Sequence, residues 1–133
     1  MWTGIRLIED SSVKTEMIVP LTWRTINSWK TMFFAGIAAG VDITGGFACL
    51  ELAQQNNVGI LYKDMNIKFL RRVDSDLNLI CNDIEKIHAC AQDAIDTNTR
   101  QNVVVDVRGY CYKYSKEKPV ISASLTLSMK IIQ

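Results

Sequence analysis

Two segments near the end of the chain alternate apolar and polar residues with a period of two, which is typical of strands with one covered face. In residues 119–131 one face carries serine, threonine and lysine, and the other carries Ile121, Ala123, Leu125, Leu127, Met129 and Ile131. Residues 102–114 repeat the pattern with three valines on one face. The charged segment between them, YSKEKP, predicts a hairpin connection. The two segments predict an antiparallel sheet covered on one side.

Three further segments predict shorter strands and a short helix. Residues 4–20 alternate loosely around the turn-like Asp10-Ser11-Ser12, which predicts a bent or paired strand that ends at Pro20. Residues 76–82 predict a short strand. Isoleucine and alanine recur at helical spacing between residues 84 and 97, and this predicts a short helix.

Residues 58–72, VGILYKDMNIKFLRR, predict another strand. An uninterrupted period of two gives one face to Tyr62, Asp64, Asn66 and Lys68, and the other to Lys63, Met65, Ile67 and Phe69. We therefore expect Tyr62 and Met65 to lie on opposite faces of the sheet.

The longest apolar segment of the chain predicts a helix over residues 30–55. It is apolar all round, so it is expected to be buried on all sides and to cover the sheet. Its glycines each cost roughly 1 kcal/mol relative to alanine inside a helix, and we interpret them as positions of close packing. The alternative is a membrane-spanning helix, but an aspartate at its centre costs about 2.5–3.5 kcal/mol on insertion. We expect no membrane insertion and a single α+β domain over residues 1–133.

That aspartate, Asp42, is the one charge between residues 32 and 50. On a helix its neighbours one turn away are Ala38, Ala39, Gly45 and Gly46, so the carboxylate would lie in a groove of small side chains. A carboxylate there is costly unless it is paired, hydrogen-bonded or open to a ligand. Two interpretations remain open: a catalytic or ligand-contacting acid, or a buried structural acid bonded to a hydroxyl such as that of Thr44 or Ser28.

Composition narrows the range of partners. The chain has 133 residues, with 15 basic and 14 acidic side chains, and lacks the basic excess of a nucleic-acid-binding protein. Four cysteines without a CxxC spacing and a single histidine argue against a Cys/His zinc site, so we expect no metal and no cofactor. The opening MWTGIRLIED lacks the features of a secretory signal, which indicates a cytoplasmic protein. We expect Cys49 and Cys90 in the core and His88 on the surface.

Three segments of the sequence together carry a resemblance to a known family: FAGIAAGVDITGGFACLELAQQ, ILYKDMNIKFLRRVDSDLNLIC and SASLTLSMKI. They resemble an uncharacterised branch of the hotdog-fold acyl-CoA thioesterase-like proteins, over about residues 25 to 131. The resemblance implies a hotdog fold, in which a curved antiparallel sheet wraps around a long central helix. It also implies self-association as a homodimer or homotetramer, with acyl-CoA or a similar thioester as the partner and its CoA moiety as part of the substrate.

The phenylacetate-type thioesterases of this superfamily have an HGG motif before the helix and an acid two to three turns later. The acid position corresponds to Asp42, and the HGG position to residues 33–35 or 34–36, so this chain lacks the histidine. The resemblance further matches Asn27 to the asparagine of the preceding loop. It implies thioester hydrolysis with Asp42 as general base or nucleophile and Asn27 as a second catalytic residue.

The same interpretation assigns substrate contacts. The amides of Phe34, Ala35 and Gly36 at the start of the helix would polarise the thioester oxygen. Because Asp42 lies about 9–12 Å further along the helix, we expect a site shared across a dimer. Substrate would also touch Gly45 and Gly46.

Three basic residues near the end of the 58–72 strand, Lys68, Arg71 and Arg72, would meet the phosphates of CoA, unless they form a solvated strand end. The tryptophans near the N-terminus, Trp2, Trp23 and Trp29, would cap an acyl tunnel or fill the core. The missing histidine supports a second hypothesis, a non-catalytic acyl-binding or regulatory hotdog domain.

Overall fold

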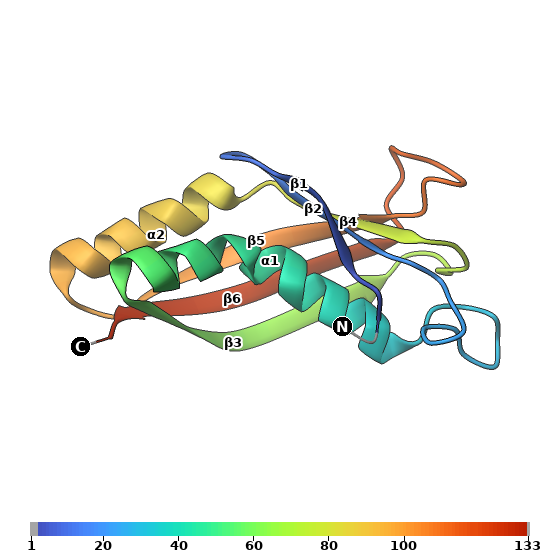
Figure 1. Ribbon diagram of the computed structural model, residues 1–133, viewed down its shortest axis with the longest axis horizontal. Helices are drawn as coiled ribbons and strands as arrows, with labels where there is room; N and C mark the ends of the chain where they lie inside the picture. The colour runs from blue at the N-terminus through green and yellow to red at the C-terminus, as the bar shows by residue number, and fades with distance from the viewer. Residues whose placement is uncertain (1–2, 133) are drawn as a thin grey trace.

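One long helix lies across the concave side of a six-stranded antiparallel sheet (Figure 1). The computed structural model describes residues 3–132. In chain order the elements are β1 (Arg6–Asp10), β2 (Thr15–Val19), α1 (Phe34–Asn56), β3 (Val58–Phe69), β4 (Leu77–Cys81), α2 (Ile84–Thr97), β5 (Gln101–Tyr110) and β6 (Ile121–Ile131). The strand order is β1-β2-β4-β5-β6-β3, and every neighbouring pair is antiparallel. The predicted α+β architecture is confirmed.

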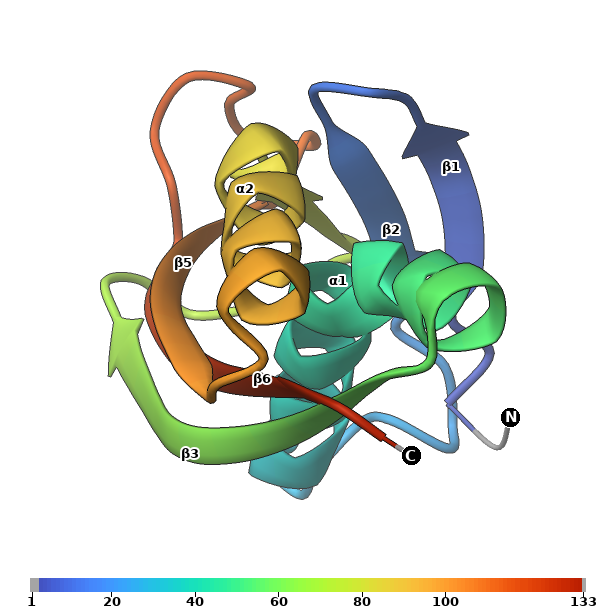
Figure 2. The same ribbon diagram turned by 90° about the vertical axis from the view of Figure 1, so that its left-hand side faces the viewer.

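Both helices lie on the same face of the sheet, and the strands curve around them (Figure 2). The apolar face of β6 supplies the floor: Ile121, Leu125 and Leu127 have no exposed surface. Helix α2 adds Ile87 and Ala94 to this core. Serine and threonine alternate with these side chains along β6 and occupy the convex face. The alternation in the sequence therefore identified the covered face correctly.

Helix α1 approaches the sheet so closely that two of its positions admit only glycine. A Cβ on Gly40 would lie 2.5 Å from Leu79 Cδ1 and 2.8 Å from Val19 Cγ2, and a Cβ on Gly45 would overlap Leu125. The packing role expected for these glycines is confirmed. The helix is long and apolar enough to cross a membrane, but over half of its most apolar window, 56%, is buried within the fold. Packing against the sheet accounts for its apolar composition.

The helix begins at Phe34, four residues later than the predicted start at residue 30. Residues 26–32 form a tight hairpin instead, in which Ile26 pairs with Met32. At the tip of this hairpin Lys30 adopts a left-handed conformation with φ of 61°. At the other end α1 stops at Asn57, which is also left-handed and donates its N–H to Leu52 O. Asn57 therefore caps the helix and leads directly into β3.

Strand β3 contains a bulge that changes the predicted facing of Tyr62. Tyr62 pairs with Leu127 and Asp64 pairs with Thr126, so Lys63 is an extra residue without a partner on β6. Because of this insertion, Tyr62 shares the concave face with Met65 instead of lying opposite to it. The prediction that Tyr62 lies with Asp64, Asn66 and Lys68 is wrong, since the period of two restarts at the bulge.

The cysteines and the histidine occupy the environments that we expected. Cys49 and Cys90 are buried, as are Cys81 and Cys111, and all four thiols are free. Burial raises the pKa of the Cys49 thiol to about 12. His88 lies exposed on α2. None of these side chains is close enough to others to suggest a metal site within residues 3–132.

Substituting Gly40 tests the close approach of α1 to the sheet. We expect Gly40→Ala to lower the free energy of unfolding by about 1–2 kcal/mol, because overpacking against Leu79 and Val19 exceeds the gain in helix propensity. The matched control is Gly36→Ala, whose Cβ would meet only Phe33 and Met32 side chains at 3.3 Å or more. Its effect should stay within about 1 kcal/mol. Urea unfolding of both variants checks this, and equal stability of the two would contradict the packing argument.

Candidate active site between the central helix and the edge strand

Asp42 lies half-buried on the side of α1 that faces β3. It borders an open hollow of about 380 Å³, which is also lined by Ala38, Ala39, Tyr62 and Met65. The two alanines leave the carboxylate accessible because they add little bulk along the helix. Of the expected groove of small residues, Ala38 and Ala39 line this hollow.

The side chain that shares this hollow with Asp42 is Tyr62, a residue that sequence reasoning did not select. Burial, together with the nearby charge of Asp42, raises the pKa of the Tyr62 hydroxyl well above its usual value. Gly46 makes this possible, since a Cβ at that position would overlap the phenol oxygen. The two hydroxyls considered from the sequence are elsewhere: Thr44 donates to Gly40 O at 2.7 Å, and Ser28 lies exposed in the loop.

The first turn of α1 has amides available for a ligand. The N–H of Gly36 already donates to Phe33 O at 3.1 Å. The N–H groups of Phe34 and Ala35 have no acceptor among the described residues. The helix dipole adds partial positive charge at this end. Of the three amides expected to bind a thioester oxygen, Phe34 and Ala35 are thus the available donors.

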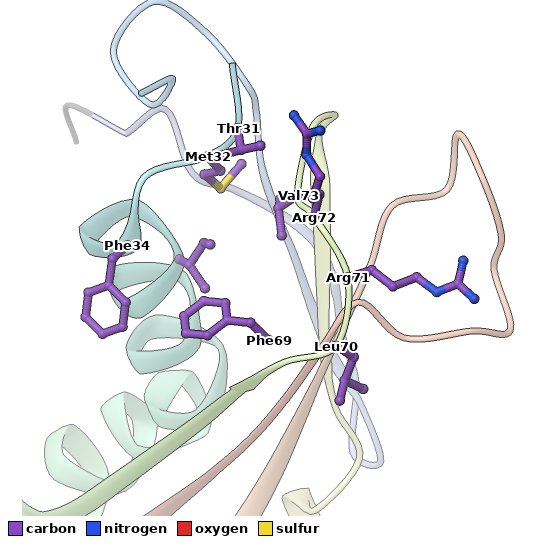
Figure 3. A pocket seen from close by; sticks show the side chains of 9 residues that line it. Thr31, Met32, Phe34, Phe69, Leu70, Arg71, Arg72 and Val73 are labelled. Atoms are coloured by element: carbon purple, nitrogen blue, oxygen red, sulfur yellow. The ribbon is translucent and has the colours of Figure 1, made fainter. Parts of the chain in front are cut away.

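A second hollow, of about 410 Å³, adjoins the start of the helix (Figure 3). Phe34 and Phe69 form its aromatic wall, with ring centroids 5.8 Å apart. Ile37, Met32 and Val73 add further apolar surface. Both aromatic rings remain more than half exposed, which is unusual for side chains of this size. The hollow is suited to an apolar group.

The three basic residues expected to act together are separated. Arg71 and Arg72 line the second hollow and also a neighbouring one of about 380 Å³ that contains Lys118. In Figure 3 Arg71 points away from α1, and Arg72 Nη2 donates to Trp29 O at 3.3 Å. Lys68 pairs with Ser122 and lies on the convex face, away from both hollows.

Asn27 closes the hairpin that precedes α1. Its side-chain oxygen accepts hydrogen bonds from the Trp29 N–H at 2.9 Å, the Thr31 N–H at 3.0 Å and the Thr31 hydroxyl at 3.1 Å. With three donors on this oxygen, the carbonyl end of the side chain is occupied. The structure therefore gives Asn27 a role in fixing the loop beside the second hollow.

Of the remaining residues expected at the site, one packs against the sheet and two are exposed to solvent. Gly45 packs against Leu125 and lies on the sheet side of α1, away from the Asp42 hollow. Trp23 and Trp29 are 81% and 80% exposed, so the idea that they fill gaps in the core is wrong. Trp2 lies outside the described residues.

Both hollows lie along β3, which is an edge of the sheet. This strand of 12 residues pairs with β6 on one side only. Leu61, on its convex face, is 60% exposed. A long edge strand with exposed apolar side chains is a surface on which another strand can add. The candidate site is therefore open toward the edge of the sheet.

Comparison with solved structures supports the fold. A protein of unknown function from Chlorobaculum tepidum TLS is 16% identical, with a TM-score of 0.81 over 98% of this chain and 85% of its own. A mutant thioesterase from Pseudomonas aeruginosa is 18% identical, with a TM-score of 0.74 over 98% and 84%. A thioesterase from Haemophilus influenzae is 15% identical, with a TM-score of 0.69 over 98% and 82%. No family model and no curated protein matches the sequence.

The chain has the hotdog fold that these solved structures share. The fold that the sequence resemblance implies is confirmed. In this hotdog fold Asp42 is on the central helix, and the two hollows lie between that helix and the edge strand.

The role of Asn27 can be tested through stability. We expect Asn27→Ala to lower the free energy of unfolding by about 1–2 kcal/mol, because it removes an acceptor shared by three donors. Ser28→Ala, on an exposed neighbour, should change stability by less than about 0.5 kcal/mol. Urea unfolding of both variants measures the difference. A fully stable Asn27→Ala would show that the loop does not depend on this side chain.

Proposed function

We propose that this protein hydrolyses a thioester, with acyl-CoA or a related carrier thioester as substrate. The observation that supports this most is the position of Asp42: a carboxylate on the buried central helix, at the wall of an open hollow. A buried structural acid would be enclosed by donors on all sides. The solved structures of the same fold include proteins named as thioesterases, which supports the same reaction class.

In the proposed reaction, Asp42 acts as general base on water or as nucleophile on the thioester carbonyl. The amides of Phe34 and Ala35 would stabilise the negative charge that develops on the carbonyl oxygen. The apolar hollow between Phe34 and Phe69 would take the acyl group. Arg71 and Arg72 would face the phosphates of the carrier, since guanidinium groups bind phosphate through paired hydrogen bonds.

One copy of the chain does not complete this site. Asp42 is seven to eight residues beyond the amide donors, which is about 10–12 Å along the helix. One carbonyl group cannot contact both, so we infer that Asp42 of one copy works with the amides of another. The exposed edge of β3 is the surface proposed for this pairing, because it borders both hollows. The four free, buried thiols support a reducing compartment such as the cytoplasm.

The alternative function is a non-catalytic acyl-binding domain. The chain has a single histidine, and it lies exposed on α2 instead of beside the start of α1. Without a second base, Asp42 would have to activate water alone. Both hypotheses predict that the protein binds acyl-CoA, and only the first predicts that it hydrolyses the thioester.

Substitution of Asp42 distinguishes the hydrolase from the non-catalytic acyl-binding domain. Against a panel of acyl-CoA thioesters, we expect turnover by the wild type and a fall of at least about a hundredfold in Asp42→Asn, the usual scale for loss of a general base. Release of free thiol measures the rate. Asp93→Asn is the matched control, since Asp93 lies exposed on α2, away from both hollows and from β3, and its substitution should leave turnover unchanged. Binding of acyl-CoA by the wild type without turnover favours the alternative.

The pairing through β3 predicts a dimer whose loss reduces turnover. Leu61→Lys places a charge on the free edge, and we expect at least about a tenfold weaker dimer with a parallel fall in activity. Leu7→Lys is the control, because Leu7 is exposed on β1, the opposite edge of the sheet. Sedimentation velocity over a range of concentrations gives the dissociation constant. An unchanged dimer in Leu61→Lys would place the interface elsewhere.

A further inference from the structure

We propose that Tyr62 is a positioning residue for Asp42, holding one oxygen of its carboxylate while the other faces the hollow. This inference rests on the proposed function for its role in turnover, and on the contact itself for its physical basis. Three features support this: the bulge in β3, the gap at Gly46 on α1 and the chemistry of the pair.

The first feature is the bulge in β3. With Lys63 unpaired, Tyr62 faces α1 on the concave side, where it pairs with Leu127. Without the extra residue, the same strand pattern would put its ring on the convex face together with Asp64. Bulges commonly re-aim a side chain next to a functional site. Here the re-aimed side chain is the one that reaches Asp42.

The second feature is the gap at Gly46, one turn after Asp42 on the helix. The phenol oxygen lies where a Cβ on residue 46 would be, so any other residue would displace it. Gly46 thus differs from Gly40 and Gly45, which accommodate side chains of the buried core. Here the gap accommodates a polar oxygen instead of an apolar methyl group.

The third feature is the chemistry of the pair. A phenol keeps its proton at neutral pH and acts as a donor, and burial and the charge of Asp42 both raise the pKa of Tyr62 further. Cys49 also lies near the phenol, and its thiol is neutral because burial raises its pKa to about 12. A donor fixed on one oxygen limits rotation of the carboxylate. The other oxygen then stays directed at water or substrate.

This arrangement assigns a second function to the edge strand. Met65 follows Tyr62 on the same face and lines the same hollow. The strand proposed to meet a second copy therefore also carries the residue that orients the acid. Pairing of two copies would bury this contact further from water, where a hydrogen bond to a charged group is stronger.

The experiment compares Tyr62→Phe, Gly46→Ala and the control Tyr110→Phe, a tyrosine on the convex face of β5. With acyl-CoA substrates, we expect Tyr62→Phe to lower kcat by about tenfold with KM changed less than about twofold, because a charge-assisted hydrogen bond is lost while the hollow is kept. Gly46→Ala, which displaces the same oxygen, should lower kcat to a similar extent with KM nearly unchanged, and the control should change neither.

A double-mutant cycle in urea tests the contact without any substrate. Tyr62→Phe and Asp42→Ala should shift the unfolding midpoint non-additively, because each removes the same interaction. Turnover that is unchanged in Tyr62→Phe would overturn the positioning role and leave the proposed hydrolysis intact. A wild type without turnover would overturn the proposed hydrolysis, and the cycle then decides whether Tyr62 holds the acid. Additive shifts would refute the pairing in either case.

Discussion

The close approach of α1 to the sheet is the constraint on which the rest of the structure depends. At Gly40 and Gly45 the helix backbone lies against Leu79 and Leu125, with no space for a side chain. Interiors packed to this density do not allow the helix to rotate or slide without loss of contacts. The glycines therefore fix which side of α1 faces β3, and with it the direction of Asp42.

An acid can occupy such a helix because its surroundings are only partly apolar. Asp42 is half-buried, borders an open hollow and has the Tyr62 hydroxyl beside it. A carboxylate with access to water and a hydroxyl nearby avoids most of the cost of burial. The same partial exposure keeps it chemically accessible. The partial exposure of Asp42 thus explains both why the fold tolerates the charge and why the carboxylate is accessible.

The sequence located the elements well because their signals are local. A period of two in β6 and the apolar composition of α1 depend on nearby residues alone. The bulge at Lys63 depends on the curvature of β3 against β6, which no local pattern records. The helix wheel separates Gly45 from Asp42 by about 60°, and only the position of β3 shows that one faces the sheet and the other the hollow. The acid could be selected from the sequence, and its partner Tyr62 could not.

The bulge has a consequence for how this chain can vary. Lys63 is exposed and has no partner on β6, so its identity matters little to the sheet. Its presence matters a great deal, because every side chain after it keeps its facing only while the extra residue remains. Exchange of this lysine for another amino acid is therefore neutral. Deletion of this one residue would move the side chains on one half of the strand to the opposite face of the sheet.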